Sequence, residues 1–547
     1  MRRLVAIACA AATTAALAIT APTVATAAPA RPSTVGDPSA VDKVIDWQAC
    51  SDPTLQSVGA VCGSVTVPVD YSRPHGKKIQ LAVSMVRHTV PDSQYQGVML
   101  VNPGGPGGSG LVLSFLGLFV PPAPGQKVSA GDYYDWIGFD PRGVGESAPI
   151  SCQPYYFHGD RPPYDPANGT LATWLKRSAG YAKSCAQKND VDLLNNLKTT
   201  DSARDMDSIR RALGQKVINY YGFSYGTYLG QVYTTLFPTH MRRMVLDSNV
   251  DPRNVWYKAN LSQDIAFERN VKIWFAWVAK YDSVYHLGKT EKAVEALWYK
   301  TRDQLDKNAA GGIVGGDEWT DIFLYAGYYQ STWLDLGDTF VAWVKHHDRA
   351  KLIAEFRSSD GPGNDNGFAV YNGVQCTDVQ WPQKWSTWQR DNDRVNKIAP
   401  FETWGNAWYN APCLYWPATA GTPVTVDGKG VAPALLVDET LDAATPYEGS
   451  LEVRKLYPNS VLLAEPGGTT HAGTLFGNEC VDGTIAAYLA DGTLPTRKAG
   501  NRADAVCAPL PVPVPSAASA AAASAAKAGS STRAAILAKL QLAAARG

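Results

Sequence analysis

The sequence has no excess charge of either sign and, beyond its first residues, no long hydrophobic run. Lys plus Arg number 50 and Asp plus Glu number 50 among 547 residues, so the formal net charge is zero. Proteins that bind nucleic acid or an anionic membrane surface usually carry a basic excess, so neither partner is indicated. No later stretch reaches the roughly 20 apolar residues that span a bilayer, and stable membrane insertion is not expected.

Cysteine and histidine are scarce, and their spacing argues against a metal site. The chain has nine cysteines and eight histidines, with no Cys-x-x-Cys and no His-x-x-x-His. Zinc sites in proteins depend on such spacing. We expect neither a metal nor any other cofactor.

The N-terminus has the features of an export signal. Arg2-Arg3 precede an apolar run from Leu4 to Ile19, and Ala25-Thr26-Ala27 offers a small-x-small cleavage site. This pattern is typical of a secretory signal peptide, which we place at residues 1–27, with a leader at 28–44. The protein is therefore expected to be secreted to the extracellular space.

Export makes the cysteines candidates for disulfide bonds. Removal of Cys9 with the signal peptide leaves an even number, which in an exported protein predicts four disulfides. Sequential pairing is the simplest of many possibilities, because each pair then closes a loop of modest length. The expected pairs are Cys50–Cys62, Cys152–Cys185, Cys376–Cys413 and Cys480–Cys507.

Apolar runs alternate with amphipathic segments in a way that predicts an α/β fold. Thr199–Leu213 has helical periodicity and a turn residue just past its end. The expected strands are Val61–Val69, Lys78–His88, Gln96–Asn102, Tyr134–Asp140, Val217–Phe223, Met241–Leu246, Ala432–Val437 and Ser460–Ala464. Strands that alternate with helices form a mostly parallel sheet covered on both faces.

One long stretch within this pattern differs in composition. Thirteen of the sixteen tryptophans lie between Trp256 and Trp416, mixed with helical periodicity. We interpret residues 253–425 as a mainly helical cap inserted between two parts of the core, 45–252 and 426–507. Its aromatic side chains suit an apolar substrate-binding surface, although core packing would also use many of them. The Ala/Ser/Pro-rich residues 508–547 are expected to form a low-complexity tail.

The most informative stretch is Gly222-Phe223-Ser224-Tyr225-Gly226, between an expected strand and an expected helix. Gly-x-Ser-x-Gly in this setting is typical of a nucleophile elbow, a sharp turn that exposes the serine hydroxyl. Side chains in place of the two glycines would collide with the adjoining strand and helix. Ser224 is therefore the candidate nucleophile, against the alternative of an ordinary turn.

A serine hydroxyl needs a base to take its proton and a third group to orient that base. His471 lies between small residues in a Gly-flanked loop after the last expected strand, a setting that the other histidines lack. Asp438 and Asp442 both follow the strand Ala432–Val437, and we favour Asp442 because it lies deeper in the loop. Asp247, at another strand end, is a third candidate.

A glycine-rich loop, Pro103–Gly110, directly follows the strand Gln96–Asn102. Its backbone N–H groups can approach a ligand closely, and the Lys-Ser/Thr of a phosphate-binding loop is missing. With a nucleophilic serine downstream, the loop fits an oxyanion hole better than a phosphate site or a flexible connection. Arg142, after the next strand, is interpreted as a brace for nearby loops rather than a ligand for a substrate carboxylate.

Five stretches together resemble a known family over residues 45–507. They are Asn102-Pro103-Gly104-Gly105-Pro106-Gly107, Gly138-Phe139-Asp140-Pro141-Arg142-Gly143-Val144-Gly145, Gly222-Phe223-Ser224-Tyr225-Gly226, Leu441-Asp442-Ala443-Ala444-Thr445-Pro446, and His471-Ala472-Gly473 with Cys480 after it. The chain resembles the secreted, Streptomyces-type tripeptidyl aminopeptidases, serine peptidases of the α/β-hydrolase fold related to prolyl iminopeptidases and mycobacterial carboxylesterase-A-type proteases. Pro103, where prolyl iminopeptidases carry His, and Ala472, where Gly is common, are departures that remove no required functional group.

The resemblance implies an α/β-hydrolase fold with a helical cap and a catalytic triad of Ser224, Asp442 and His471, in the order that this fold uses. It also implies an oxyanion hole formed by the backbone N–H of Tyr225 with that of Gly104 or, as we favour, Gly105. The implied activity is release of short peptides, expected to be tripeptides, from the free N-termini of peptides or proteins.

An aminopeptidase must also hold the substrate ammonium group, for which the cap carboxylates Asp378 and Glu402 are candidates, although a surface or packing role is the favoured interpretation for each of them. Two alternatives stay open. One is a secreted carboxylesterase or lipase with the same triad, and the other is a catalytically silent binding protein with an aromatic recognition surface.

Overall fold

The computed structural model describes residues 45–359 and 363–515. The expected signal peptide, the leader and most of the expected tail lie outside these residues. The described residues all belong to one unit of the chain. No helix in this described part is both long and apolar enough to cross a bilayer.

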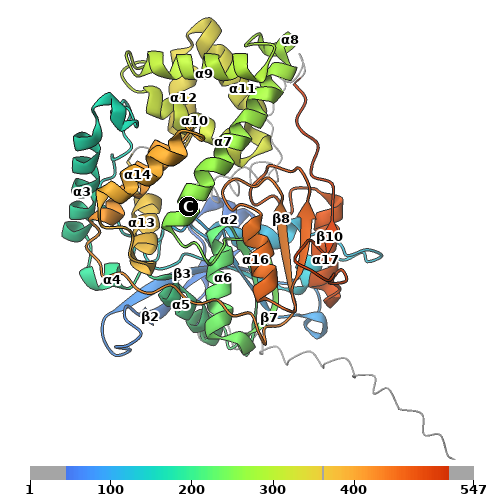
Figure 1. Ribbon diagram of the computed structural model, residues 1–547. Coiled ribbons are helices and arrows are strands. Elements are labelled where there is room, and N and C mark those ends of the chain that lie inside the picture. The colour runs from blue at the N-terminus through green and yellow to red at the C-terminus, as the bar shows by residue number, and fades with distance from the viewer. Residues whose placement is uncertain (1–44, 360–362, 516–547) are drawn as a thin grey trace, which may run out of the picture. The chain divides into compact units, whose positions relative to one another are not determined.

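The described residues form one ten-stranded sheet in the order β1-β2-β3-β5-β4-β6-β7-β8-β9-β10 (Figure 1). The strands are β1 (Gln48–Ala49), β2 (Val61–Pro68), β3 (Lys78–Val86), β4 (Val98–Asn102), β5 (Asp135–Phe139), β6 (Ile218–Phe223), β7 (Met241–Asp247), β8 (Ala434–Glu439), β9 (Val461–Glu465) and β10 (Ala505–Val506). From β5 through β10 neighbouring strands are parallel, whereas β1, β2, β3 and β5 pair antiparallel. The expected strands are confirmed to within about two residues at their ends.

Alternate side chains of the central strands supply two separate cores, because successive residues of a strand point to opposite faces. One face packs on α5 (Thr199–Ala212), α6 (Tyr225–Leu236) and α16 (Glu448–Leu456) through Leu100, Tyr220, Leu246 and Leu436. The other packs on the 3-10 helix η2 (Leu111–Phe119) and on α17 (Glu479–Asp491) through Met99, Tyr221, Val245 and Leu435. The expected sheet covered on both faces is confirmed.

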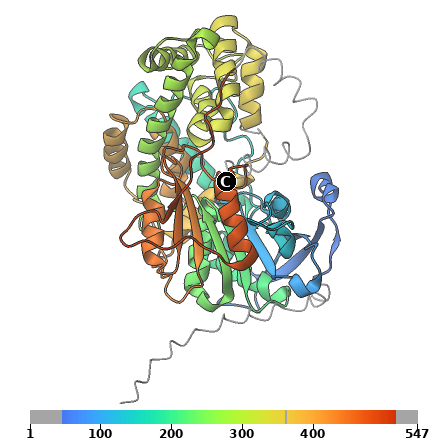
Figure 2. The same ribbon diagram turned by 90° about the vertical axis from the view of Figure 1, so that its right-hand side faces the viewer.

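A run of helices lies between β7 and β8. They are α7 (Tyr257–Lys280), α8 (Asp282–Tyr285), α9 (Glu291–Leu305), α10 (Gly316–Tyr328), α11 (Trp333–His346), α12 (Arg349–Ser359), α13 (Asn366–Asp378), α14 (Trp385–Asn396) and α15 (Thr403–Asn410). Helices α8 to α12 gather at one end of the described part, away from the strands, and α7 runs from them toward the sheet in both views (Figures 1 and 2). Aromatic residues of α7, α9, α10 and α11 form a core of their own there. We propose that α7 to α15 together constitute the expected cap.

A helix from another part of the chain joins this group. Helix α3 (Leu171–Lys188), between β5 and β6, packs its Trp174 against Trp408 of α15 with stacked rings 5.6 Å apart. The short helices α2 (Pro53–Ser57) and α4 (Val191–Asn195) complete the described helices of the core sequence. The segment 508–515 also reaches the helices of the cap, where the Trp277 indole donates to the carbonyl of Pro513 at 2.8 Å. The sequence did not predict either contact.

The disulfides and Arg142 have the expected structural roles. Bonds join Cys50 to Cys62, Cys152 to Cys185, Cys376 to Cys413 and Cys480 to Cys507, which confirms sequential pairing. The buried guanidinium of Arg142 makes two hydrogen bonds of 2.7 Å to the Asp205 carboxylate and donates to the carbonyls of Val69 and Asn196. It braces loops of the core, as the sequence indicated.

Candidate active site

Ser224 occupies the sharp turn between β6 and α6. Its backbone has φ 54° and ψ −127°, a strained conformation for a residue with a side chain. A Cβ on Gly222 would lie 2.6 Å from the carbonyl oxygen of Gly226, and a Cβ on Gly226 would lie 2.7 Å from that of Asn102. The expected elbow is present, and its glycines are required by close backbone contacts.

The glycine-rich loop packs directly on this elbow. Gly104 has φ +100°, and a Cβ there would lie 2.8 Å from the Cβ of Ser224. The Gly104 N–H donates to the side-chain oxygen of Asn102 at 3.0 Å. Gly105, with φ +109°, lines the cavity into which the elbow faces. Of the two glycines considered from the sequence, Gly104 has its N–H engaged in holding the loop.

His471 and Asp442 form a buried pair. Nδ1 of His471 lies 2.7 Å from Oδ2 of Asp442, and the two side chains are at most 1% exposed. The other carboxylate oxygen accepts from the backbone N–H groups of Ala444 and Thr445, at 2.8 and 3.1 Å. The Thr445 hydroxyl donates to Oδ2 at 2.9 Å. The tight loop after β8 therefore surrounds the carboxylate with donors that fix its orientation toward the imidazole.

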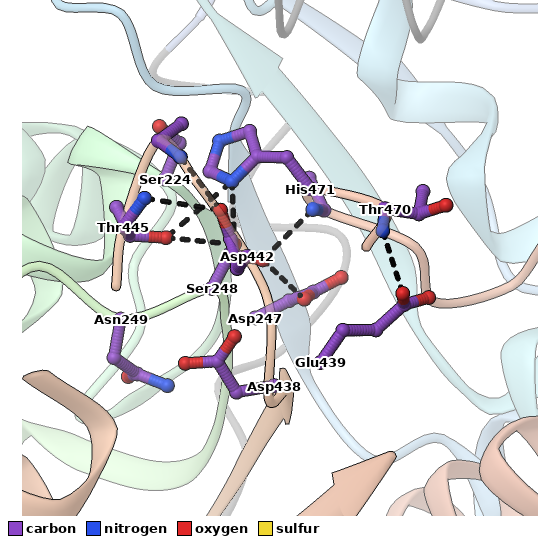
Figure 3. A network of polar contacts seen from close by, with 12 residues as sticks. Ser224, Asp247, Ser248, Asn249, Asp438, Glu439, Asp442, Thr445, Thr470 and His471 are labelled. Atoms are coloured by element: carbon purple, nitrogen blue, oxygen red, sulfur yellow. Dashed lines mark hydrogen bonds and ion pairs between the residues drawn. The ribbon is translucent and has the colours of Figure 1, made fainter. Parts of the chain in front are cut away.

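The structure brings Ser224 and His471 together. In Figure 3, Ser224 lies beside the imidazole ring of His471 and Asp442 lies below it. Nε2 of His471 is buried and has no hydrogen-bond partner among the described residues. Catalytic hydrogen bonds are often long in unliganded enzymes and shorten when substrate binds. The free nitrogen is the one that a serine proton would reach.

A residue of α10 also holds the imidazole loop in place. The backbone N–H of His471 donates to the carbonyl oxygen of Tyr328 at 2.8 Å. The Tyr328 ring meets the imidazole edge-on, with ring centres 5.8 Å apart. The imidazole of His471 is therefore positioned by α10 as well as by Asp442.

The two other candidate acids have different partners. Asp438 accepts a hydrogen bond from Ser450, and burial together with the nearby Asp442 carboxylate raises its pKa well above the usual range. Asp247 accepts from the N–H and hydroxyl of Thr474, at 3.0 and 2.7 Å, and burial raises its pKa to about 6. These carboxyl groups support the loops around the site, while Asp442 contacts the imidazole.

A cavity of about 800 Å³ opens above Ser224. Ser224, Tyr225 and Gly105 line it from the sheet, and Trp256, Phe267, Tyr328 and Tyr371 are among the aromatic residues that line it from the cap. Cavities of this size and composition bind drug-sized ligands. A short peptide would meet apolar walls with a few polar groups between them.

Only one of the two cap carboxylates considered from the sequence reaches this cavity. Glu402 lines it. Asp378 instead accepts hydrogen bonds from the N–H and hydroxyl of Thr199, at 2.7 and 2.6 Å, and from the Trp256 indole at 3.1 Å. These bonds tie the first turn of α5 to α13, so Asp378 has the packing role that the sequence analysis favoured over binding of the ammonium group.

Sequence reasoning missed further polar residues that line or support the cavity. Asn260 and Asp264 are one turn apart on α7, and Asn406 and Asn410 of α15 follow its N-cap residue Glu402 at the same interval. The two rows face each other, since the Asn406 amide donates to Asp264 at 2.7 Å. Polar residues at i, i+4 within an otherwise aromatic segment were the signal that could have revealed them.

Comparisons with known proteins show which family the chain belongs to. A family model described as "TAP-like protein" matches residues 399–507. A tripeptidyl aminopeptidase of Streptomyces lividans is 42% identical over 495 residues, which cover 88% of this chain and 89% of that protein. Serine protease Hip1 of Mycobacterium tuberculosis is 30% identical over 82% of this chain and 89% of its own length. Carboxylesterase B of the same species is 31% identical over 82% and 88%, respectively. The chain belongs to the tripeptidyl aminopeptidase family, serine hydrolases of the α/β-hydrolase fold.

Proposed function

We propose that this protein is a secreted serine exopeptidase that releases tripeptides from free peptide N-termini. The observation that carries the proposal is the hydrogen-bonded Asp442–His471 pair beside Ser224, at the floor of a cavity that the cap covers. The 42% identity to a tripeptidyl aminopeptidase supports the substrate class. Four disulfides support export, because such bonds persist in oxidising compartments.

In the acylation step, His471 Nε2 takes the proton of the Ser224 hydroxyl while Oγ attacks the carbonyl carbon of the scissile bond. Asp442 keeps the imidazole in the tautomer with Nε2 free and stabilises the imidazolium that forms. The negative oxygen of the tetrahedral intermediate accepts hydrogen bonds from the N–H groups of Gly105 and Tyr225. The imidazolium then gives its proton to the leaving amine.

Deacylation repeats these steps with water. His471 removes a proton from the water, whose oxygen attacks the acyl carbon, and the same two N–H groups stabilise the second intermediate. Collapse of that intermediate returns the proton to Ser224 and releases the short peptide. These two reaction steps need no cofactor.

The competing function is a carboxylesterase, which the 31% identity to carboxylesterase B favours. The fold and the triad suit both reactions, because ester and amide hydrolysis use the same machinery. The test compares Ala-Ala-Pro p-nitroanilide with a free N-terminus, its acetyl-blocked form and short acyl esters, with products identified by mass. We expect cleavage of the free peptide with loss of three residues at once. Equal cleavage of the blocked peptide would exclude the exopeptidase function.

A further inference from the structure

Asn270 lies in the middle of α7, and its side chain is fully buried. The amide nitrogen Nδ2 donates to the carbonyl oxygen of Leu441 at 2.8 Å and to that of Gly327 at 3.1 Å. These two bonds use both protons of the amide. The carbonyl oxygen of Thr469 lies 3.5 Å from the same nitrogen, at the limit of a hydrogen bond. One side chain of α7 therefore meets three segments that are far apart in the sequence.

Two of these segments carry the proposed acid and base. Leu441 directly precedes Asp442 in the loop after β8. Thr469 lies two residues before His471 in the loop after β9. Asn270 is thus one residue away from the acid and two residues away from the base, and it contacts the backbone of both loops rather than the reacting side chains.

The third segment, the end of α10, supports the base. Gly327 accepts the bond from Asn270, and the next residue, Tyr328, accepts the backbone N–H of His471 at 2.8 Å. Helices α7 and α10 approach closely at this point, since a Cβ on Gly327 would lie 2.5 Å from the ring of Phe267. The bond between α10 and the base therefore depends on how α10 is held against α7, to which Asn270 contributes.

Arg269, the preceding residue of α7, adds to this junction. Its Nη2 donates to the carbonyl oxygen of Leu441 at 2.5 Å and to that of Asp442 at 3.1 Å. Its Nε donates to the side-chain oxygen of Asn270 at 3.0 Å. A carbonyl oxygen has two lone pairs, and both of those on Leu441 are met by neighbouring side chains of α7. The loop that carries the Asp442 carboxylate is therefore fixed to α7 through its backbone.

We propose that Asn270 is a positioning residue, which fixes the loops of Asp442 and His471 relative to each other through their backbone carbonyl groups. Arg269 assists it from the neighbouring position. This inference rests on the proposed triad. A buried amide whose bonds are all made holds the segments around it in one arrangement, because hydrogen bonds tolerate only a narrow range of distances. Helix α7 is then part of the scaffold of the acid and the base, and not only a wall of the cavity.

Loss of this amide should affect the reaction more than binding. The carbonyl oxygens of Leu441 and Gly327 would lose a donor in a buried place, and the loops would shift until both groups found other partners. A displacement of about 1 Å between catalytic groups costs about 10²-fold in rate. Asn270 lies outside the lining of the cavity that the described residues form. The expected mark of its role is a fall in kcat at constant KM.

The first experiment measures kcat and KM per active site for free Ala-Ala-Pro p-nitroanilide and for p-nitrophenyl acetate. Active sites are counted with p-nitrophenyl diethyl phosphate: the Ser224 oxygen bonds to phosphorus, and one p-nitrophenolate leaves per site. We expect Asn270→Ala to lower kcat about 10- to 100-fold for both substrates, with KM within about threefold. The rate of phosphorylation should fall in parallel. Unfolded protein lowers only the number of sites, so misfolding cannot imitate this result.

A second substitution separates hydrogen bonding from packing. Asn270→Leu fills a similar volume without N–H groups and should lose as much kcat as Asn270→Ala. If Asn270→Leu keeps the original kcat, packing alone is required and the proposal is overturned.

The matched control is Asn392→Ala. Asn392 is 2% exposed on α14, and its amide donates to the carbonyl oxygen of Trp388 in the same helix at 2.9 Å. It therefore resembles Asn270 in burial and residue type but bonds within its own helix. This variant should keep kcat per site within about threefold. A loss equal to that of Asn270→Ala would also overturn the proposal.

Should the Asn270 variants not fold, Arg269→Met decides. The Arg269 side chain is only half-buried, and its loss leaves the bond from Asn270 to Leu441 in place. We expect kcat per site to fall about 3- to 10-fold, the effect of one hydrogen bond, with KM unchanged. Arg302→Met, at a half-buried arginine of α9 that pairs with Asp303, is the control and should keep kcat. An unchanged kcat in Arg269→Met would overturn the proposal.

The two proposals fail in different ways. If Ser224→Ala keeps full activity, the triad itself is wrong. If Ser224→Ala is inactive but Asn270→Ala keeps the original kcat per site, only the assignment of Asn270 is overturned. The comparison of peptide with ester substrates does not affect this assignment, because both reactions use the same acid and base.

Discussion

The backbone N–H of Ser224 donates a hydrogen bond to the carbonyl oxygen of Asp247 at 3.0 Å. The carboxylate of Asp247 in turn accepts from the N–H and hydroxyl of Thr474, three residues after His471. One residue at the end of β7 therefore connects the elbow with the loop of the proposed base (Figure 3). If Ser224, His471 and Asp442 form the proposed triad, the geometry of attack depends on this connection as well as on those three residues.

Asp247→Ala should lower kcat about 10²-fold with little change in KM. The substitution keeps the carbonyl that binds Ser224 but releases Thr474, and a displacement of about 1 Å at a catalytic group costs this much. Steady-state kinetics with the free peptide anilide would measure the effect. Thr474→Val, which keeps the N–H bond and removes the hydroxyl, should lose less than Asp247→Ala, and equal losses would contradict this reading.

Asp442→Asn should lower kcat about 10⁴-fold, because an amide in this place favours the imidazole tautomer that cannot accept the serine proton. The matched control is Asp438→Asn, four residues before Asp442. Asp438 accepts a hydrogen bond from Ser450 and does not contact the imidazole, burial and the nearby Asp442 carboxylate raise its pKa, and an amide has nearly the same shape. We expect this control to keep activity within about threefold. A large loss of kcat in Asp438→Asn would instead assign the role of the triad acid to Asp438.

Much of the fold and the site follows from local sequence patterns. The elbow needs glycines at 222 and 226 because backbone atoms approach them, and such constraints leave a short motif in the chain. Strand ends position Asp442 and His471 in loops that follow β8 and β9 directly. The pairing of cysteines near each other along the chain follows from the short loops that they close. These features depend on a few neighbouring residues and are readable from them.

The cavity wall could not be predicted in the same way. Asp378 and Glu402 are both carboxylates in an aromatic segment, and only tertiary packing decides that Asp378 faces Thr199 while Glu402 faces the cavity. The packing of Trp174 on Trp408 joins residues far apart in the sequence. A hydrophobic pattern identifies buried faces but does not select their partners. The substrate-binding surface is made of such long-range contacts.

Two carboxyl groups that lie opposite each other on neighbouring strands should make the protein less stable at alkaline pH. Glu439 and Glu465 lie opposite each other on β8 and β9, and burial raises their pKa values to about 9 and about 8. Since both values exceed the ordinary value of 4.5, the folded state binds more protons than the unfolded state at intermediate pH. The free energy of unfolding therefore falls as pH rises toward about 9.

Glu439→Gln should reduce this loss by a few kcal/mol, on the order expected for a pKa shift of several units. Its amide oxygen can still accept the Thr470 N–H that Glu439 accepts at 2.6 Å. Urea unfolding between about pH 6 and 9 would measure the slope. Glu479→Gln, an exposed position at the start of α17, is the control and should leave the slope as it is. If the free energy of unfolding of Glu439→Gln depends on pH as steeply as that of the unmodified protein, the pair Glu439–Glu465 is not the source of this pH dependence.

The disulfide Cys152–Cys185 should affect substrate binding as well as stability. It joins residues 33 positions apart and holds α3, whose Trp174 packs on α15, the helix that follows Glu402. The double Ser variant should lose about 3–4 kcal/mol of stability and show a higher KM, because the wall of the cavity loses a support.

Cys50–Cys62 provides the comparison, since it lies at the sheet edge near β1 and β2 and closes a loop of 12 positions. Its double Ser variant should lose about 3 kcal/mol and keep the original KM. Thermal unfolding and kinetics on both variants, measured well below their melting temperatures, would separate stability from binding. If both variants raise KM equally, general destabilisation is the cause, whereas an effect confined to Cys152–Cys185 assigns α3 to the support of the substrate cavity.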